Sequence, residues 1–164
     1  MFDRFGEFDS AEEINLTADG LFNEGDFENI KVLAKENGID EAYAEAFTAG
    51  DIPVLCDAMT AAIGKLDMEA AELKPKEIME DWLDYIKARC AEEEEMAAAV
   101  RKKGKSLKGC IAALLVWSFG HQNAVDKDNL KEAKVSGARV TLGIPGIGTA
   151  KKIITEYYLG KKAI

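Results

Sequence analysis

The chain has few of the residues that build disulfide frameworks, metal sites and membrane spans. Its three cysteines, Cys56, Cys90 and Cys110, lie far apart and form no C-x-x-C pair, which excludes a disulfide framework and a zinc knuckle. The single histidine, His121, has no second histidine beside it, and no acidic metal-binding pattern organises the carboxylates, so we predict no metal and no cofactor. The longest apolar run, Ile111–Trp117, is far shorter than the roughly 20 residues that a membrane span needs.

Signals for export and for catalysis are also missing. The segment Met1–Phe5 has no basic stretch followed by an apolar core, so it does not resemble a secretory signal. Unpaired cysteines suit a reducing compartment, and we therefore expect a cytoplasmic protein without membrane contact. Gly104-Lys105-Ser106 is similar to the end of a P-loop, but Ala99 stands where that loop needs its first glycine. No nucleophile, base and orienting group form a recognisable set, so we do not expect an enzyme.

Charge is abundant and is divided unequally along the chain. Residues 1–99 hold 26 Asp and Glu against 8 Lys and Arg, whereas residues 100–164 hold 4 against 13. The formal net charges of the two regions are −18 and +9, which the overall value of −9 hides. Such asymmetry favours charged partners, although the two regions can instead neutralise each other within one fold or across a dimer.

Composition and helix punctuation predict an all-α fold of about seven to nine helices. Prolines number only 3, and Ala, Glu, Lys and Leu, which favour helices, are common. Capping residues and apolar stripes predict helices over Ala11–Asn23, 27–37, 41–49, 52–66 with Pro53 in the first turn, 76–90, 92–103, 107–122, 127–136 and, capped by Thr149, 150–158. One short extended segment is expected near 138–144. The helix over 107–122 is apolar almost all round, which predicts a central place in the core.

The change of charge sign is the best internal boundary that the sequence offers. We therefore predict an acidic helical region over 1–99 and a basic helical module over 100–164, which together form either one compact unit or two. The exposed cations of the basic module are the candidate contacts for nucleic acid or another partner: Arg101, Lys102, Lys103, Lys105, Lys108, Lys151 and Lys152.

A glycine-rich turn precedes the last predicted helix. Ile144–Ala150 resembles the hairpin of helix-hairpin-helix DNA-binding modules, in which backbone N–H groups hold a phosphate. That interpretation makes Gly146, Gly148 and Thr149 a phosphate-binding turn. Ala150, however, follows the last glycine by two residues where those modules place an alanine at four, and the preceding stretch is β-prone. A structural turn that feeds a helix cap remains the alternative.

Two short motifs between residues 101 and 160 carry a family resemblance. Lys105-Ser106-Leu107-Lys108-Gly109-Cys110 opens one helix, and the aromatic pair Tyr157-Tyr158 lies near the end of another. This combination resembles the PcfK-like family of small proteins from conjugative plasmids, integrative elements and phages. Members of its Firmicutes branch resemble anti-CRISPR inhibitors of type II RNA-guided nucleases. The resemblance implies a mobile-element protein with a CRISPR effector complex as its partner.

Three functions follow as hypotheses. The first is a non-enzymatic inhibitor that binds a type II CRISPR nuclease with the help of charge, because such nucleases hold nucleic acid in basic channels. The second is an accessory protein of element transfer or maintenance that binds DNA or RNA through residues 100–164. The third is a helical adaptor or homodimer with no role in nucleic-acid binding. The sequence leaves the oligomeric state open.

Overall fold

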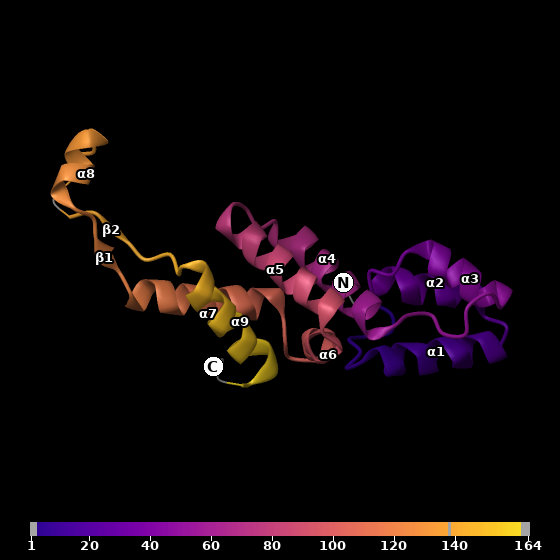
Figure 1. Ribbon diagram of the computed structural model, residues 1–164. Coiled ribbons are helices and arrows are strands. Elements are labelled where there is room, and N and C mark those ends of the chain that lie inside the picture. The colour runs from indigo at the N-terminus through magenta and orange to yellow at the C-terminus, as the bar shows by residue number, and fades with distance from the viewer. Residues whose placement is uncertain (1–2, 138, 162–164) are drawn as a thin grey trace. The chain divides into compact units, whose positions relative to one another are not determined.

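The computed structural model describes residues 3–137 and 139–161, and within them it contains nine helices and one two-stranded sheet (Figure 1). The fold is all-α, as the sequence predicts. The chain divides into two compact units, residues 1–109 (unit 1) and residues 110–164 (unit 2). The charge changes sign near residue 100, so unit 1 also contains five of the candidate cations, which we call the first basic cluster: Arg101, Lys102, Lys103, Lys105 and Lys108. The formal net charges of the units are −13 and +4.

Unit 1 consists of helices joined by short turns. It contains α1 (Ala11–Asn23), α2 (Phe27–Glu36), α3 (Glu41–Ala49), α4 (Ala58–Leu73), α5 (Ile78–Glu92), α6 (Glu94–Arg101) and the start of α7 (Leu107–Gly120). α1 packs against α2, α2 against α3, and α4 against both α5 and α6. The apolar core beneath α1–α4 includes Ile14, Ile30, Leu33 and Leu55, all fully buried.

The predicted N-terminal caps of the first helices are confirmed. The Ser10 hydroxyl accepts the Glu13 N–H at 3.2 Å, and the Glu13 carboxylate accepts the Asp9 N–H at 2.8 Å, one residue before the cap. Asp26 and Asp40 cap α2 and α3 in the same way through their carboxylates.

The predicted start of the fourth helix is wrong. α4 begins at Ala58 with Asp57 as its cap, so Pro53 lies in the turn before the helix. The reason is a side chain of α1: the Asn15 amide accepts the Cys56 N–H at 3.0 Å and donates to the Cys56 carbonyl at 2.8 Å. Both backbone groups of Cys56 are thereby withdrawn from helical hydrogen bonds, which delays the helix until Asp57 caps it.

Two glycines allow the backbone at the end of α2 to lie directly against the backbone of α4. Gly38, with φ of 68°, follows the end of α2 and lies directly against Gly64 of α4. A Cβ atom on either glycine would collide with the backbone of the other segment, at Gly64 in one direction and at Asn37 and Gly38 in the other.

Unit 2 contains the rest of α7, β1 (Asn123–Ala124), α8 (Lys127–Glu132), β2 (Thr141–Leu142) and α9 (Ile147–Leu159). The two strands pair antiparallel, with Asn123 opposite Leu142 and Ala124 opposite Thr141. This pair confirms a short extended segment within the predicted 138–144, of which position 138 lies outside the described residues.

Three predictions for unit 2 are wrong. α8 ends at Glu132 and does not reach Ser136. Thr149 does not cap α9, because the helix begins at Ile147 with Gly146 in the cap position. α7 is not buried all round, since its side chains at Leu115, Val116 and Phe119 are exposed. Apolar composition on every face therefore does not place α7 at the centre of a core.

Candidate interaction surfaces

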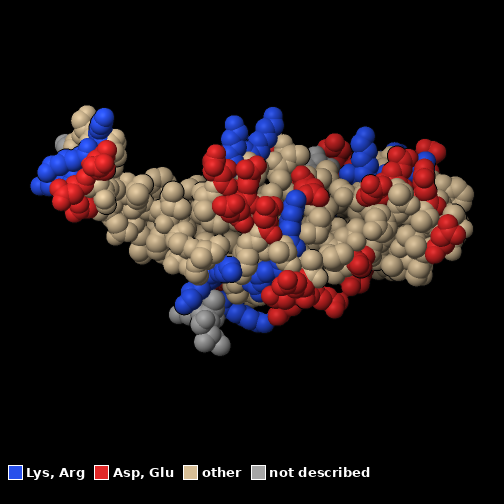
Figure 2. Space-filling view, turned by 45° about the horizontal axis from the view of Figure 1, so that its top comes forward, with Lys and Arg blue, Asp and Glu red and all other residues tan. Residues whose placement is uncertain are grey.

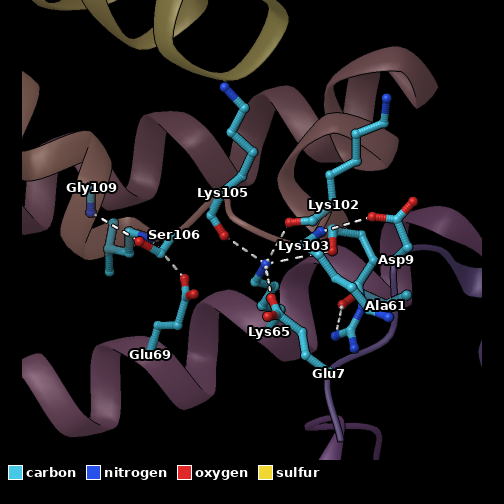
Figure 3. Close-up of polar contacts among 12 residues, drawn as sticks. Glu7, Asp9, Ala61, Lys65, Glu69, Lys102, Lys103, Lys105, Ser106 and Gly109 are labelled. Carbon is cyan, nitrogen blue, oxygen red and sulfur yellow. Dashed lines mark hydrogen bonds and ion pairs between the residues drawn. The ribbon is translucent and has the colours of Figure 1, made fainter.

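A buried lysine organises the polar interior of unit 1. Lys65 lies on the inner face of α4, and its side chain is only 1% exposed. Its ammonium group donates to the carbonyl oxygens of Lys102 at 3.0 Å and Lys105 at 2.7 Å, and it forms an ion pair with Glu7 at 2.9 Å (Figure 3). These three acceptors match the three N–H donors of the ammonium group, and a buried cation is stable only with such partners. Lys65 therefore fixes the backbone that follows α6.

Arg101, the last residue of α6, is the second buried cation of unit 1. It is also 1% exposed, and its guanidinium donates to the side-chain oxygen of Asn37 at 2.5 Å and to the carbonyl of Ala61 at 3.4 Å. Desolvation by burial lowers the pKa of Arg101. The sequence places Arg101 among the candidate binding residues, but its side chain is directed into the protein and joins α6 to α4 and to the end of α2.

Glu69 is the one buried carboxylate among the described residues of unit 1. Its Oε2 accepts the N–H of Leu107 at 2.9 Å, and the hydroxyl of Ser106 accepts the N–H of Gly109 at 3.0 Å (Figure 3). Both contacts satisfy N–H groups at the start of α7, where a negative charge also suits the helix dipole. Desolvation raises the pKa of Glu69, while the hydrogen bond from Leu107 and the charge of Lys65 oppose that rise.

Substitutions of Glu69 separate its hydrogen bond from its charge. Glu69→Ala leaves the Leu107 N–H without its acceptor, and we expect the free energy of unfolding to fall by about 1–3 kcal/mol. Glu69→Gln keeps an oxygen acceptor and removes the desolvated charge, so its stability at pH 7 should remain within about 1 kcal/mol of the parent. Urea unfolding measures both.

The difference in stability between Glu69→Gln and the parent should depend on pH. The folded-state pKa of Glu69 lies above its unfolded-state value, so the folded protein binds more protons between those two values. The contribution of Glu69 to stability is therefore greatest at low pH and decreases as the pH rises through the raised pKa. The stability of Glu69→Gln relative to the parent should increase with pH, and a constant difference from pH 4 to pH 8 would contradict this account.

The remaining cations of the first basic cluster differ in exposure. Lys102, Lys103 and Lys108 are exposed, whereas Lys105 is half-buried with its carbonyl bound to Lys65. The backbone between α6 and α7 is held further by Asp9, whose carboxylate accepts the Lys103 N–H at 3.0 Å. The backbone that carries these lysines is thus held in place by Lys65 and Asp9. Unit 1 exposes three of the five predicted cations at its surface.

Two further candidate cations belong to unit 2. Lys151 and Lys152 are exposed in α9, and Gly148 and Thr149 lie within the first turn of that helix. Gly146 occupies the cap position without a side-chain hydrogen bond. The segment before the turn contains β2, where a helix-hairpin-helix module would have a helix.

The surface of unit 1 is strongly acidic, and burial changes its formal net charge only from −13 to −14. Two of its cations, Lys65 and Arg101, are buried, while Glu69 is the one carboxylate in the described part of unit 1 that is buried with them. Surface ion pairs, such as Lys87 with Asp67 at 2.5 Å, neutralise a cation and a carboxylate together and leave the excess of negative charge unchanged. Figure 2 shows Asp and Glu side chains gathered over unit 1. The acidity of this surface therefore comes mainly from the composition of unit 1, in which Asp and Glu outnumber Lys and Arg two to one.

Other candidates for chemistry have structural roles. His121 stacks on Trp117 with ring centroids 4.1 Å apart, and its Nδ1 lies 2.8 Å from the Trp117 carbonyl, so it caps α7. All three cysteines are buried, and desolvation raises the pKa of each thiol to about 12, which leaves them unreactive at neutral pH. Within residues 3–137 and 139–161, no group of His, Cys, Asp and Glu side chains is arranged to hold a metal ion.

Sequence reasoning missed the residues that build the interior network, namely Glu7, Lys65 and Glu69. The signal for two of them is present, because Lys65 and Glu69 are four residues apart on the side of α4 that also carries the buried Ala61 and Leu66. Glu7 has no local signal, since it lies before α1 and reaches Lys65 only through the tertiary fold.

None of the helices in the described part of the chain has the length and hydrophobicity that crossing a membrane requires. No protein-family model matches the chain, and neither the curated proteins nor the solved structures include a significant match.

Proposed function

We propose that the protein is a non-enzymatic inhibitor of a type II CRISPR RNA-guided nuclease and that it binds through the acidic surface of unit 1. The observation that carries the proposal is the excess of carboxylates on the surface of unit 1, which holds 26 Asp and Glu against 13 Lys and Arg, with Glu69 as the one buried carboxylate among its described residues. The choice of partner is supported by the resemblance of residues 101–160 to PcfK-like proteins. RNA-guided nucleases offer a complementary surface, because they hold nucleic acid in positively charged channels.

A row of carboxylates along α5 is the part of this surface best suited to such a channel. Asp81, Asp84 and Glu92 are exposed, and with Ala88 they recur every three or four residues on one face of the helix. Glu95, at the start of α6, is exposed as well. We call these four carboxylates the acidic ridge. α5 fixes the spacing of Asp81, Asp84 and Glu92, so binding does not require ordering of a flexible acidic tail.

Electrostatic attraction of this kind has measurable consequences. Complementary charges accelerate encounter and favour the correct partner, and salt weakens them because mobile ions screen exposed groups. Binding to an effector complex should therefore weaken steeply as salt rises.

Neutralising the acidic ridge should weaken binding selectively. In Asp81→Asn/Asp84→Asn/Glu92→Gln we expect the dissociation constant for a guide-loaded type II effector to rise about 10-fold or more at low salt. A matched control removes three exposed carboxylates of α1 and α2 (Glu12→Gln/Asp19→Asn/Glu28→Gln) and should raise it less than about 3-fold. The dissociation constant is measured over a series of salt concentrations by surface plasmon resonance with the effector immobilised.

Two results would overturn the proposal. The first is the absence of binding at low salt to each of several type II effectors. The second is binding that neither salt nor the ridge substitutions affect.

Nucleic-acid binding through residues 100–164 is the second candidate. It is favoured by the exposure of Lys102, Lys103 and Lys108 in unit 1 and of Lys151 and Lys152 in unit 2. In that case the full chain should shift DNA or RNA in a gel, with a salt slope of several charges, and Lys151→Glu/Lys152→Glu should weaken the shift. A shift with these properties, together with no binding to effectors, would replace the inhibitor proposal with this one.

A further inference from the structure

α7 exposes an apolar stripe that the rest of unit 2 leaves uncovered in its described residues. Ala112, Leu115, Val116 and Phe119 are exposed and recur at spacings of three, one and three residues, so they lie on one face of the helix. Val116 is 74% and Phe119 is 78% exposed. In Figure 2 the part of unit 2 next to the charged α8 is free of blue and red side chains. Contiguous exposed apolar surface of this kind marks an interaction site. We call these four residues the α7 stripe.

We infer that the α7 stripe binds the α7 stripe of a second copy of this chain, with the two helices antiparallel. The stripe is self-complementary under a two-fold axis that passes near residue 114. An antiparallel pair with its two-fold axis near residue 114 brings together residues whose numbers add to about 227 or 228. Ala112 of each copy therefore lies opposite Leu115 and Val116 of the other. A small residue thus faces large ones on both sides of the axis, which allows the side chains to interdigitate.

Charge complementarity supports the antiparallel direction. Lys108 stands one turn before Ala112, and the same register places it opposite Phe119 of the other copy, at the C-terminal end of that helix. The last turn of α7 carries no basic side chain, so a lysine from a second copy would meet the negative end of the helix dipole and an aromatic ring.

The unequal charge of the units favours the same direction. Unit 1 has a formal net charge of −13 and precedes most of α7 in the chain. Antiparallel pairing lets the two acidic units leave the helix pair at opposite ends, whereas parallel pairing would bring them to the same end. Repulsion between like charges therefore disfavours the parallel arrangement.

The mass of the full chain in solution tests the dimer. Over about 1 to 300 μM, sedimentation equilibrium should show the mean mass rising from 17.9 kDa towards twice that value, because one helix face buries less than a standard interface of about 800 Å² per partner. Val116→Lys should raise the dimer dissociation constant about 30-fold or more. Leu16→Lys is the matched control: Leu16 is 70% exposed on α1, and its substitution should leave the dissociation constant unchanged.

Far-UV circular dichroism should show that both variants fold, because both positions are exposed. A chain that stays monomeric over the whole range would overturn the inference. A dimer that Val116→Lys leaves intact would also overturn it. The acidic-ridge proposal is independent of either result, because it concerns unit 1.

Disulfide trapping tests the register. Chains carrying Ala112→Cys and chains carrying Val116→Cys are mixed and oxidised, while the native cysteines are buried and stay inert. Antiparallel pairing offsets positions 112 and 116 of opposite copies by about 1 Å along the axis, against roughly 5 to 7 Å for like positions. The mixed 112–116 disulfide should predominate, and a predominance of 112–112 and 116–116 disulfides would contradict the antiparallel arrangement.

Discussion

Gly64→Ala should lower the free energy of unfolding by about 3 kcal/mol or more, the largest loss that we expect from a single small substitution. The added Cβ would collide with the carbonyl oxygens of Asn37 and Gly38, where the end of α2 crosses α4. Backbone atoms cannot rotate away as a side chain can, so α2 and α4 must separate. That movement also disturbs Asn37, whose side chain holds Arg101. Urea unfolding followed by circular dichroism measures the loss.

Gly20→Ala is the matched control, because it adds the same methyl group to a helix where nothing lies within 4 Å of the new atom. Alanine favours a helix over glycine, so this variant should be more stable than the parent by about 0.5–1 kcal/mol. Equal effects of the two substitutions would refute the close approach of α2 to α4.

Lys65→Ala should lower the free energy of unfolding by about 3–5 kcal/mol, which is the second large effect that we expect. It removes the ammonium group that binds the Lys102 and Lys105 carbonyls and the Glu7 carboxylate, and it leaves a gap in the interior of unit 1. Carbonyl groups that lose a buried donor are left without compensation for their desolvation. We expect the segment between α6 and α7 to become protease-sensitive even where the rest of unit 1 stays folded.

Lys87→Ala provides the comparison, since Lys87 forms its ion pair with Asp67 at the surface. Such pairs contribute about 1 kcal/mol or less, so this variant should remain close to the parent in urea unfolding. A loss for Lys65→Ala as small as that for Lys87→Ala would show that Lys65 does not hold the interior together.

Local sequence signals predicted most of the helical fold, because caps and glycine stops act over a few residues. Ser10, Asp26 and Asp40 satisfy the first N–H groups of their helices without tertiary help. The predicted start of α4 was wrong because the backbone of Cys56 binds the side chain of Asn15, which lies 41 residues earlier in the chain. Contacts of this kind have no periodic signature.

The candidate binding residues show the same limit. Arg101 and Lys102 are neighbours with the same charge sign, and only the fold buries one and exposes the other. Arg101 is on the inner face of α6 and reaches Asn37, 64 residues away, whereas Lys102 follows the end of the helix. Counting Lys and Arg residues in the sequence therefore overestimated how many of them lie at the surface of unit 1.

The exposed face of α7 could not be inferred from composition. Leu107, Cys110 and Leu114 are buried while Val116 and Phe119 are exposed, although all five are apolar. Hydrophobic periodicity identifies a covered face only when polar residues mark the other one. In α7 no polar face marks the exposed side, so the sequence pattern could not locate it.

Competition between this protein and target DNA tests the central claim most directly. A guide-loaded type II effector is given labelled target DNA with increasing amounts of the full chain, at low and at high salt. If the acidic surface of unit 1 occupies the basic nucleic-acid channel, the two ligands should exclude each other, and the apparent dissociation constant for DNA should rise in proportion to the inhibitor at low salt. A ternary complex in which the effector binds DNA with unchanged affinity would contradict the account.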